Sequence, residues 1–227
     1  MNLAGEVAVK NKKERDRNLQ ENILVVPNTA AVQKNTNFHG FRPGTDHNLW
    51  TQFAAEGLFL DRDIVEDDTR YKQLIVYLVL RCRQEIFIYQ RIRETGEKRL
   101  LDMYSFGLGG HINPVHSHSF RRLITSNLTR ELKEEVSFKG QYSYRFLGFL
   151  NDQEEEVGRY HFGLVFLVSC LSPHISVREK NKIQGKLVPV SRLVEYQDNL
   201  ENWSLILLPY IPDLVGMCTG DSPSCTR

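Results

Sequence analysis

Apolar residues along the chain fall into short runs with the character of β-strands. Runs of β-branched and aromatic residues predict strands at ILVVP (23–27), QLIVYLVLRC (73–82) and EIFIYQRI (85–92), the last two spaced as in a hairpin. A further strand is expected to run from LLDMY into the glycines of FGLGGHI (106–112). Later strands are predicted at YRFLGFLND, GRYHFGLVFLVSC and GKLVPV. Strands therefore outnumber helices in the middle of the chain.

Helical periodicity is strongest over residues 119–136. Large apolar residues recur there at every fourth position, and a serine is placed to cap the helix. A shorter helix is expected to begin after Asp46 and to end near Gly57. The segment NLENWSLILLPYIPDL (199–214) predicts a closing helix.

The chain divides into four parts by pattern. Residues 1–22 mix charges with few large apolar groups and predict a flexible arm. Residues 23–69 are expected to form an N-terminal extension that packs on the core, and residues 70–215 form the principal domain. Residues 216–227 have no apolar period and are expected to be disordered.

Composition and charge exclude several classes of protein. With 227 residues, 41% of them hydrophobic, the chain can bury a core in one domain. Its 29 basic and 28 acidic side chains nearly cancel, so no global field favours nucleic acid or a membrane surface. The longest apolar runs are far shorter than the roughly 20 residues of a membrane-spanning helix, so a cytoplasmic protein is expected. The cysteines show neither zinc-site nor disulfide spacing, and stand at Cys82, Cys170, Cys218 and Cys225.

The predicted helix ends in an acidic stretch, TRELKEEV (129–136). Glu131, Glu134 and Glu135 fall within roughly a third of the helix circumference. Such like-charge pairs destabilise a helix by roughly 0.2 to 0.5 kcal/mol each, and the macrodipole disfavours anions at this end. A positive group is therefore expected nearby, either Arg130 or a hard divalent cation with oxygen ligands. A solvated acidic face is the alternative.

A glycine-rich segment, an apolar helix start and this acidic core follow one another after a strand. Their order resembles the signature of the Nudix hydrolase family, G-x5-E-x7-R-E-U-x-E-E-x-G-U, in which U is a bulky aliphatic residue. The matching residues are Gly110, Arg130, Glu131, Leu132, Glu134 and Glu135. The GGHIN, GFLND, HFGLVF and LENWS segments are similar to a subgroup of that family, over about residues 70–212. The resemblance implies an α/β fold, a Nudix-type α/β/α sandwich with a mixed sheet.

The chain departs from the signature in two respects. Gly110 lies about six residues further from Arg130 than the signature requires, because a histidine-rich stretch is inserted. Arg122 stands where the signature has its first glutamate, and Ser137 replaces the second glycine. The resemblance implies that the first glutamate chiefly pairs with the arginine of the signature, and that metal binding depends on the second half of the signature.

The resemblance implies a hydrolase that uses Mg2+ or Mn2+. Glu131, Glu134 and Glu135 would hold the metal, together with a backbone carbonyl of Gly109 or Gly110. The glycines are expected to form a sharp turn that approaches a ligand closely. A metal-bound water would attack the diphosphate.

Arg130 completes the expected catalytic set. A base from the same helix, or from DQEEE (152–156), would take the proton of the attacking water. An exposed hairpin tip is the alternative for that acidic run. The side chains expected to bind substrate are Arg91, Arg93, His111, Asn113, Asn151 and His161.

The expected activity is hydrolysis of a nucleoside diphosphate linked to another group. The expected partner is this small molecule, with no nucleic acid and no membrane, and a homodimer is left open. A Nudix-fold protein that binds nucleotides without turnover is the first alternative, because Arg122 and Ser137 depart from the signature. An isopentenyl-diphosphate isomerase-like enzyme would need a catalytic cysteine, and Cys82 lies in no matching motif. A scaffold with an acidic helix would have no metal site.

Overall fold

The structure is a computed structural model that describes residues 21–92, 101–117, 119–178 and 183–216. Its strands are β1 (Asn22–Pro27), β2 (Gly40–Pro43), β3 (Leu58–Asp61), β4 (Tyr71–Cys82), β5 (Glu85–Arg91), β6 (Tyr104–Ser105), β7 (Gly107–His111), β8 (Val136–Phe138), β9 (Tyr142–Asn151), β10 (His161–Cys170), β11 (Ile175–Val177) and β12 (Ile183–Pro189). Its helices are α2 (Ala30–Thr36), α3 (His47–Glu56), α4 (Arg62–Val65), α5 (Phe120–Glu135), α6 (Asn202–Leu207) and α7 (Ile211–Gly216), with 3-10 helices η2 (Val157–Arg159), η3 (Val190–Asn199) and η4 (Leu208–Tyr210).

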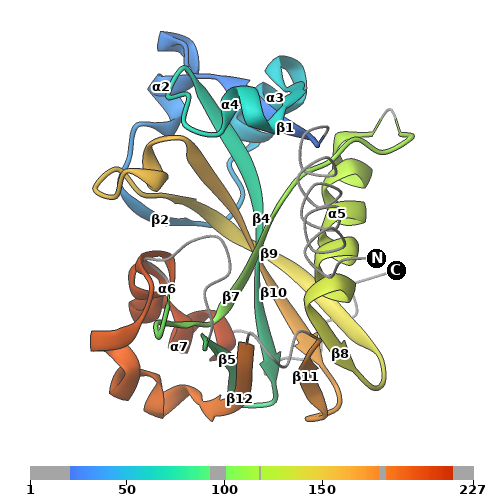
Figure 1. Ribbon diagram of the computed structural model, residues 1–227, viewed down its shortest axis with the longest axis vertical. Coiled ribbons are helices and arrows are strands. Elements are labelled where there is room, and N and C mark those ends of the chain that lie inside the picture. The colour runs from blue at the N-terminus through green and yellow to red at the C-terminus, as the bar shows by residue number, and fades with distance from the viewer. Residues whose placement is uncertain (1–20, 93–100, 118, 179–182, 217–227) are drawn as a thin grey trace, which may run out of the picture.

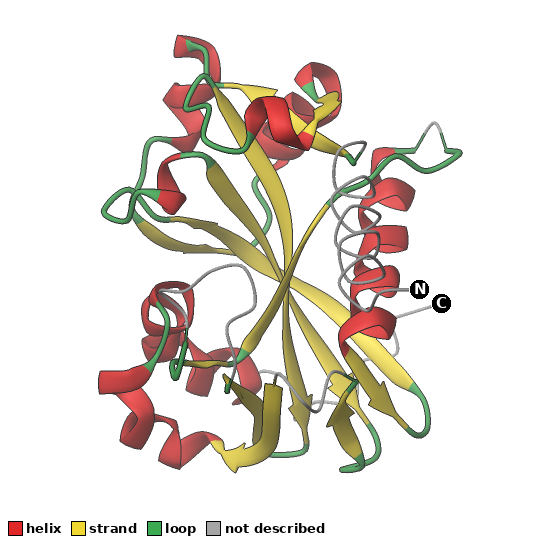
Figure 2. Cartoon of the chain, viewed as in Figure 1, coloured by secondary structure: helices red, strands yellow, loops and turns green. Residues whose placement is uncertain are grey.

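A mixed sheet forms the centre of the molecule (Figure 1). Its strands follow the order β12-β5-β4-β10-β9-β2, while β1 and β7 also pair with β4, and β6 pairs with β5. Helix α5 packs on one side of the sheet, and α6 and α7 pack on the other. Figure 1 labels these helices, and Figure 2 shows in red the helices that flank the yellow strands. The predicted α/β/α sandwich with a mixed sheet is confirmed.

The central strand β4 explains why the sequence shows an unbroken apolar run at this point. Its even-numbered residues, Leu74 to Leu80, join the core beneath α3 and α5. Its odd-numbered residues Tyr77 and Val79 join a second core beneath α6, α7 and η3. Because successive side chains of a strand point to opposite faces, a strand covered on both faces must be apolar throughout.

Helix α5 forms where the fourfold apolar repeat predicted it. The hydroxyl of Ser119 accepts a hydrogen bond from the backbone N–H of Arg122 and caps the first turn. The buried stripe contains Ile124, Leu128 and Leu132, which pack on the sheet. The helix ends at Glu135, and strand β8 follows directly.

The glycine segment is a strand and not the sharp turn that the sequence predicted. Strand β7 pairs antiparallel with β4 along its whole length. None of Gly107, Gly109 and Gly110 has a positive φ. The prediction of a turn was wrong because Gly107 and Gly110 serve here for close approach within an extended strand. A Cβ on Gly107 would overlap the ring of Tyr77, whereas a Cβ on Gly109 would make ordinary contacts at 3.5 Å.

The predicted closing helix is broken into shorter pieces. Helices α6 and α7 are separated by the 3-10 turn η4, and prolines stand at positions 209 and 212. Proline has no N–H to donate and clashes with the preceding turn, so one continuous helix cannot form. The preceding 3-10 helix η3 was not predicted.

The N-terminal segment is part of the central sheet. Strand β1 pairs with both β3 and β4, and β2 pairs with β9. The cap at Asp46 and the end at Gly57 of helix α3 are confirmed, and Phe53 of that helix is fully buried in the core. The arm was predicted over residues 1–22 and the tail over 216–227, and residues 1–20 and 217–227 lie outside the described residues. At the inner ends of these ranges, Asn22 begins β1 and Gly216 ends α7. In the ranges that the structure describes, no helix is long and apolar enough to span a membrane.

Candidate active site

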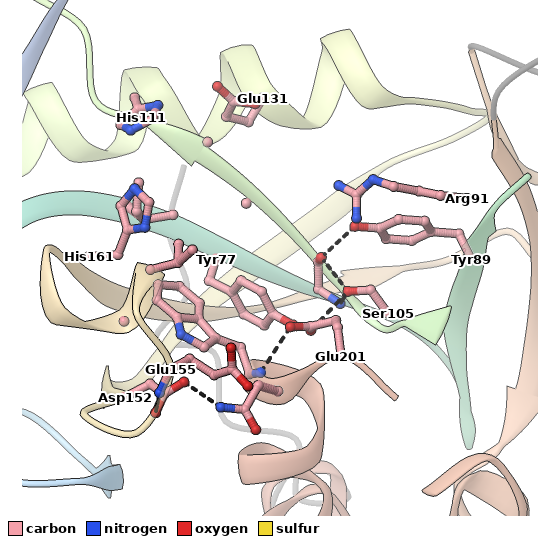
Figure 3. A pocket seen from close by; sticks show the side chains of 18 of the residues that line it. Tyr77, Tyr89, Arg91, Ser105, His111, Glu131, Asp152, Glu155, His161 and Glu201 are labelled. Carbon is pink, nitrogen blue, oxygen red and sulfur yellow. Dashed lines mark hydrogen bonds between the residues drawn. The ribbon is translucent and has the colours of Figure 1, made fainter. Parts of the chain in front are cut away.

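A pocket of about 350 Å³ lies where α5, β7 and the start of α6 meet. This volume is within the usual range for small-molecule sites. Carboxylates outnumber cations in its lining, which contains Glu21, Glu131, Asp152, Glu155 and Glu201 beside Arg62 and Arg91. Figure 3 shows Glu131 reaching in from α5 on one side, with Asp152, Glu155 and Glu201 on the other. The pocket is therefore suited to a cation or to a ligand that brings one.

Glu131 and Gly110 interlock across the gap between α5 and β7. A Cβ built on Gly110 would overlap the carboxyl group of Glu131. Only glycine leaves this space free, so the strand and the carboxylate can lie in contact. This pair, together with Gly109, forms what we call the α5 wall of the pocket.

The carboxyl group of Glu131 is poorly compensated for a buried acid. The residue is 7% exposed, and its Oε1 lies 2.7 Å from Nη2 of Arg130. Burial raises the pKa of Glu131 to about 7, and the nearby Glu134 and Glu135 add to this, while Arg130 opposes it. A further positive charge would stabilise the ionised form.

Arg130 fastens α5 to the end of β7. Its Nη2 donates to the backbone carbonyl of His111 at 2.7 Å, and its Nη1 lies 2.8 Å from Oε2 of Glu134. Neither Glu134, which is exposed, nor the half-buried Glu135 lines the pocket. The structure thus brings one of the three predicted metal ligands, with Gly109 and Gly110, into the pocket. Within the described ranges, no three His, Cys, Asp or Glu side chains are grouped as a metal site.

The carboxylates opposite α5 are held by hydrogen bonds. Glu201 caps α6, accepting from the backbone N–H of Trp203 at 2.9 Å and of Ser204 at 2.8 Å. The hydroxyl of Tyr77 also donates to Glu201, at 2.7 Å. Burial, together with Glu201, raises the pKa of Tyr77 well above its usual value, so the phenol stays protonated.

The carboxylate of Asp152 is likewise held by hydrogen bonds. Its Oδ1 accepts from the backbone N–H of Glu154 at 3.0 Å, and its Oδ2 accepts from the amide of Asn202. The residue is 1% exposed, so this end of the acidic run is no exposed hairpin tip. Glu201, Asp152 and Asn202 form what we call the α6 wall.

Glu155 differs from its acidic neighbours. It is exposed and lines the pocket, and its carboxylate makes no hydrogen bond or ion pair with the side chains that the structure describes. Its backbone N–H faces Oδ1 of Asp152 at 3.4 Å, which fixes the turn that carries it. The side chain is therefore able to accept a proton from a group in the pocket.

Two neutral histidines line the pocket beside the α5 wall. The rings of His111 and His161 lie 5.6 Å apart, and burial lowers the pKa of each to about 3. The side-chain N–H groups of Gln73 donate to two backbone carbonyls, so its Oε1 must accept from Nε2 of His111 at 2.8 Å. This fixes the tautomer of His111 and leaves its Nδ1 as an acceptor.

Two arginines bring positive charge to the lining. Arg91, a predicted substrate ligand, lies over the ring of Tyr89 with its guanidinium carbon 5.6 Å from the ring centre. Arg62 of α4 was not predicted, and is held by Glu21 at 3.0 Å and Glu66 at 2.9 Å. The N-terminal segment thus contributes to the site.

The structure places two predicted substrate ligands away from the pocket lining. Asn151 is fully buried, and its side chain binds the backbone carbonyls of Thr36 at 2.9 Å and Phe38 at 2.6 Å and accepts from Lys72. Asn113 donates to Glu21 at 2.9 Å. A polar residue in an apolar strand must be hydrogen-bonded, but the sequence does not tell a ligand from a structural partner. Arg93 lies outside the described residues.

Sequence reasoning missed most of the α6 wall and the N-terminal contribution. Glu201 stands just before the apolar run of α6 and shows the acidic cap signal in LENWS, which indicated a helix but not a pocket. Tyr77 was hidden in a continuous apolar strand. No signal in the sequence marked Glu21 or Arg62.

Comparison with known proteins identifies the family. No family model matches the chain. The chain is 33% identical to Protein YmaB of Bacillus subtilis (strain 168) over 196 residues, which is 82% of this chain and 95% of YmaB. The crystal structure of Tm1382, a candidate Nudix hydrolase, is similar with a TM-score of 0.73 and 29% identity, over 86% of this chain and all of Tm1382. The chain belongs to the Nudix hydrolase family, whose members hydrolyse phosphoanhydride bonds.

Proposed function

We propose that this chain is a Mg2+-dependent pyrophosphohydrolase that cleaves a nucleoside diphosphate linked to another group, with Mn2+ as a substitute metal. The observation that supports this most strongly is the contact of Glu131 with Gly110. It places a buried, poorly compensated carboxylate directly against a strand in an acidic pocket. A hard divalent cation is the partner that such a group favours.

The donor set fits a magnesium ion. From the pocket lining, Glu131 and a backbone carbonyl of Gly109 or Gly110 would hold it. Glu134, which is paired with Arg130, and Glu135 stand outside that lining and stay predicted ligands. When bound, the ion would supply positive charge to the diphosphate oxygens and make a bound water more acidic. Oxygen donors of this kind match the preference of Mg2+.

We assign the role of general base to Glu155. The other carboxylates of the facing wall, Glu201 and Asp152, already accept hydrogen bonds from backbone N–H groups. Glu155 lines the pocket and keeps its oxygens free of described side chains. It would take the proton of the attacking water, as expected for the DQEEE segment.

The remaining lining residues would bind and orient the substrate. Arg91 carries the charge that a terminal phosphate needs, and its planar guanidinium can bind two phosphate oxygens. Neutral His111 and His161 can bind uncharged polar groups. The rings of Trp203 and Tyr77 offer an aromatic surface of the kind on which nucleobases stack. A substrate role for Arg93, a cytoplasmic location and a homodimer stay predictions.

A hydrolysis screen that detects the nucleotide products by chromatography tests the proposal. The wild-type protein is incubated with nucleoside di- and triphosphates, nucleotide sugars and dinucleoside polyphosphates, each with Mg2+, Mn2+ or EDTA. We expect turnover of at least one nucleoside diphosphate derivative with metal and none with EDTA. Saturable nucleotide binding without turnover would instead support a binding protein that has lost catalysis.

A further inference from the structure

Arg130 has a partner that the signature does not contain. The resemblance assigns the first glutamate of the signature to pairing with this arginine, and Arg122 occupies that glutamate's position. Arg122 is exposed in the first turn of α5, and its backbone N–H bonds to Ser119. Besides the carboxylates of Glu131 and Glu134, the guanidinium of Arg130 meets Asn127. The Oδ1 of Asn127 lies 3.3 Å from Nε and 3.2 Å from Nη2 of that guanidinium.

Asn127 also holds the chain segment that follows β7. The residue is 1% exposed. Its Oδ1 accepts from the backbone N–H of Asn113 at 2.9 Å, and its Nδ2 donates to the carbonyl of the same residue at 2.9 Å. Nδ2 also donates to the carbonyl of Leu123 at 3.0 Å. Both ends of the amide are thus satisfied, as a buried amide requires.

These contacts fix the distance between α5 and the end of β7. Arg130 binds the carbonyl of His111, and Asn127 binds both backbone groups of Asn113. The two side chains therefore hold the segment directly after Gly110. Gly110 itself is in contact with the carboxyl group of Glu131. A shift of this segment would move Gly110 relative to Glu131.

We propose that Asn127 is the positioning residue that replaces the missing first glutamate, and that it orients Arg130 and sets the contact of Glu131 with β7. The neutral amide provides an acceptor for Nε of Arg130 and adds two donors that a carboxylate lacks. This role rests on the proposed function, since the contact matters for catalysis only if Glu131 acts in hydrolysis.

The test compares Asn127→Leu and Asn127→Asp with a control on the same helix, Thr129→Val, which loses only a hydrogen bond to Thr125. The first readout is the Arg130 Nε–H NMR signal of the protein without metal or substrate, assigned by its loss in Arg130→Lys. We expect protection from solvent exchange in wild type and Thr129→Val, loss of protection in Asn127→Leu, and a changed chemical shift in Asn127→Asp. An unchanged signal in both Asn127 variants would overturn the proposal, and if the leucine variant does not fold, an unchanged signal in the aspartate variant alone would do so.

The second readout is steady-state hydrolysis. We expect Asn127→Leu to lower kcat at least about tenfold with KM changed less than about threefold, and Asn127→Asp to recover part of the loss. An equal loss in Thr129→Val, or a wild-type kcat in Asn127→Leu, would overturn the catalytic role. If wild type itself shows no hydrolysis, the proposed function fails, while the NMR signal still decides whether Asn127 holds Arg130.

Discussion

The α5 wall and the α6 wall both present carboxylates to one pocket, but they hold them in opposite ways. Glu201 accepts hydrogen bonds from two backbone N–H groups and from the hydroxyl of Tyr77. Glu131 has the guanidinium of Arg130 beside one oxygen, and burial raises its pKa to about 7. The number of donors around a carboxylate of this pocket thus separates a structural group, whose charge is already stabilised, from one that favours a cation.

The largest effect is expected from filling the space on the α5 wall. A side chain at position 110 would overlap the carboxyl group of Glu131, so Gly110→Val should lower kcat/KM by about 100-fold or more. Gly109→Ala should have a smaller effect, because its Cβ would make ordinary contacts at 3.5 Å. Hydrolysis rates, with Lys139→Ala as an exposed control, measure the difference. Equal rates for Gly110→Val and the control would show that the contact plays no part in activity.

The α6 wall should respond in stability more than in rate. In Glu201→Gln an amide NH2 would face the N–H of Trp203 or the other donors, leaving buried groups unpaired at a cost of about 1–3 kcal/mol. Urea unfolding should therefore show a lower free energy of unfolding than wild type. If Glu201→Gln were as stable as wild type but as inactive as Gly110→Val, Glu201 would have a role in activity and not in stability, against this account.

The free energy of unfolding is expected to depend on pH through His161, which lines the pocket between the walls. Burial first, and then His111, Arg62 and Lys72, lower its pKa from 6.5 to about 3. The unfolded chain therefore binds the proton first as the pH falls, and the free energy of unfolding decreases from pH 6.5 towards 3, by at most about 1.4 kcal/mol per pH unit for one proton. Urea unfolding of His161→Gln between pH 7 and 4 should show a shallower decrease. Identical slopes in both proteins would remove His161 from this account.

The smallest effect is expected from restoring the signature at position 122. Arg122 is exposed in the first turn of α5 and does not line the pocket. Arg122→Glu should therefore change activity by less than about tenfold, or under about 1.4 kcal/mol of transition-state stabilisation. Steady-state kinetics with Mg2+ measure this. An inactive wild type that gains metal-dependent hydrolysis in Arg122→Glu would favour a protein that only binds nucleotides.

The sequence predicted the elements that depend on local pattern. The α5 helix, its serine cap and the β4–β5 hairpin follow from apolar periodicity and turn residues, and the structure confirms them, with Ser119 as the cap. The glycines were misread because a glycine needed for close approach and a glycine needed for a turn look alike. Only the position of Glu131 across the gap tells them apart.

The site was less predictable than the fold because it joins distant segments. Glu201 and Tyr77 are 124 residues apart along the chain, and Arg62 comes from a segment without any motif. Asn151 had the expected pattern of a ligand, yet its hydrogen bonds connect β9 to the N-terminal segment. Long-range pairing decides these roles, and one sequence contains no record of it.

The most direct test of the central claim is metal-dependent hydrolysis by wild type and by Glu131→Gln, with Glu195→Gln as an exposed control outside the pocket lining. Glutamine fills the same space beside Gly110 but removes the charge that would hold the cation. We predict that Glu131→Gln keeps the circular dichroism spectrum of wild type and loses at least about 100-fold in kcat/KM, while the control matches wild type. A Glu131→Gln protein as active as wild type, with both still dependent on Mg2+, would contradict the account.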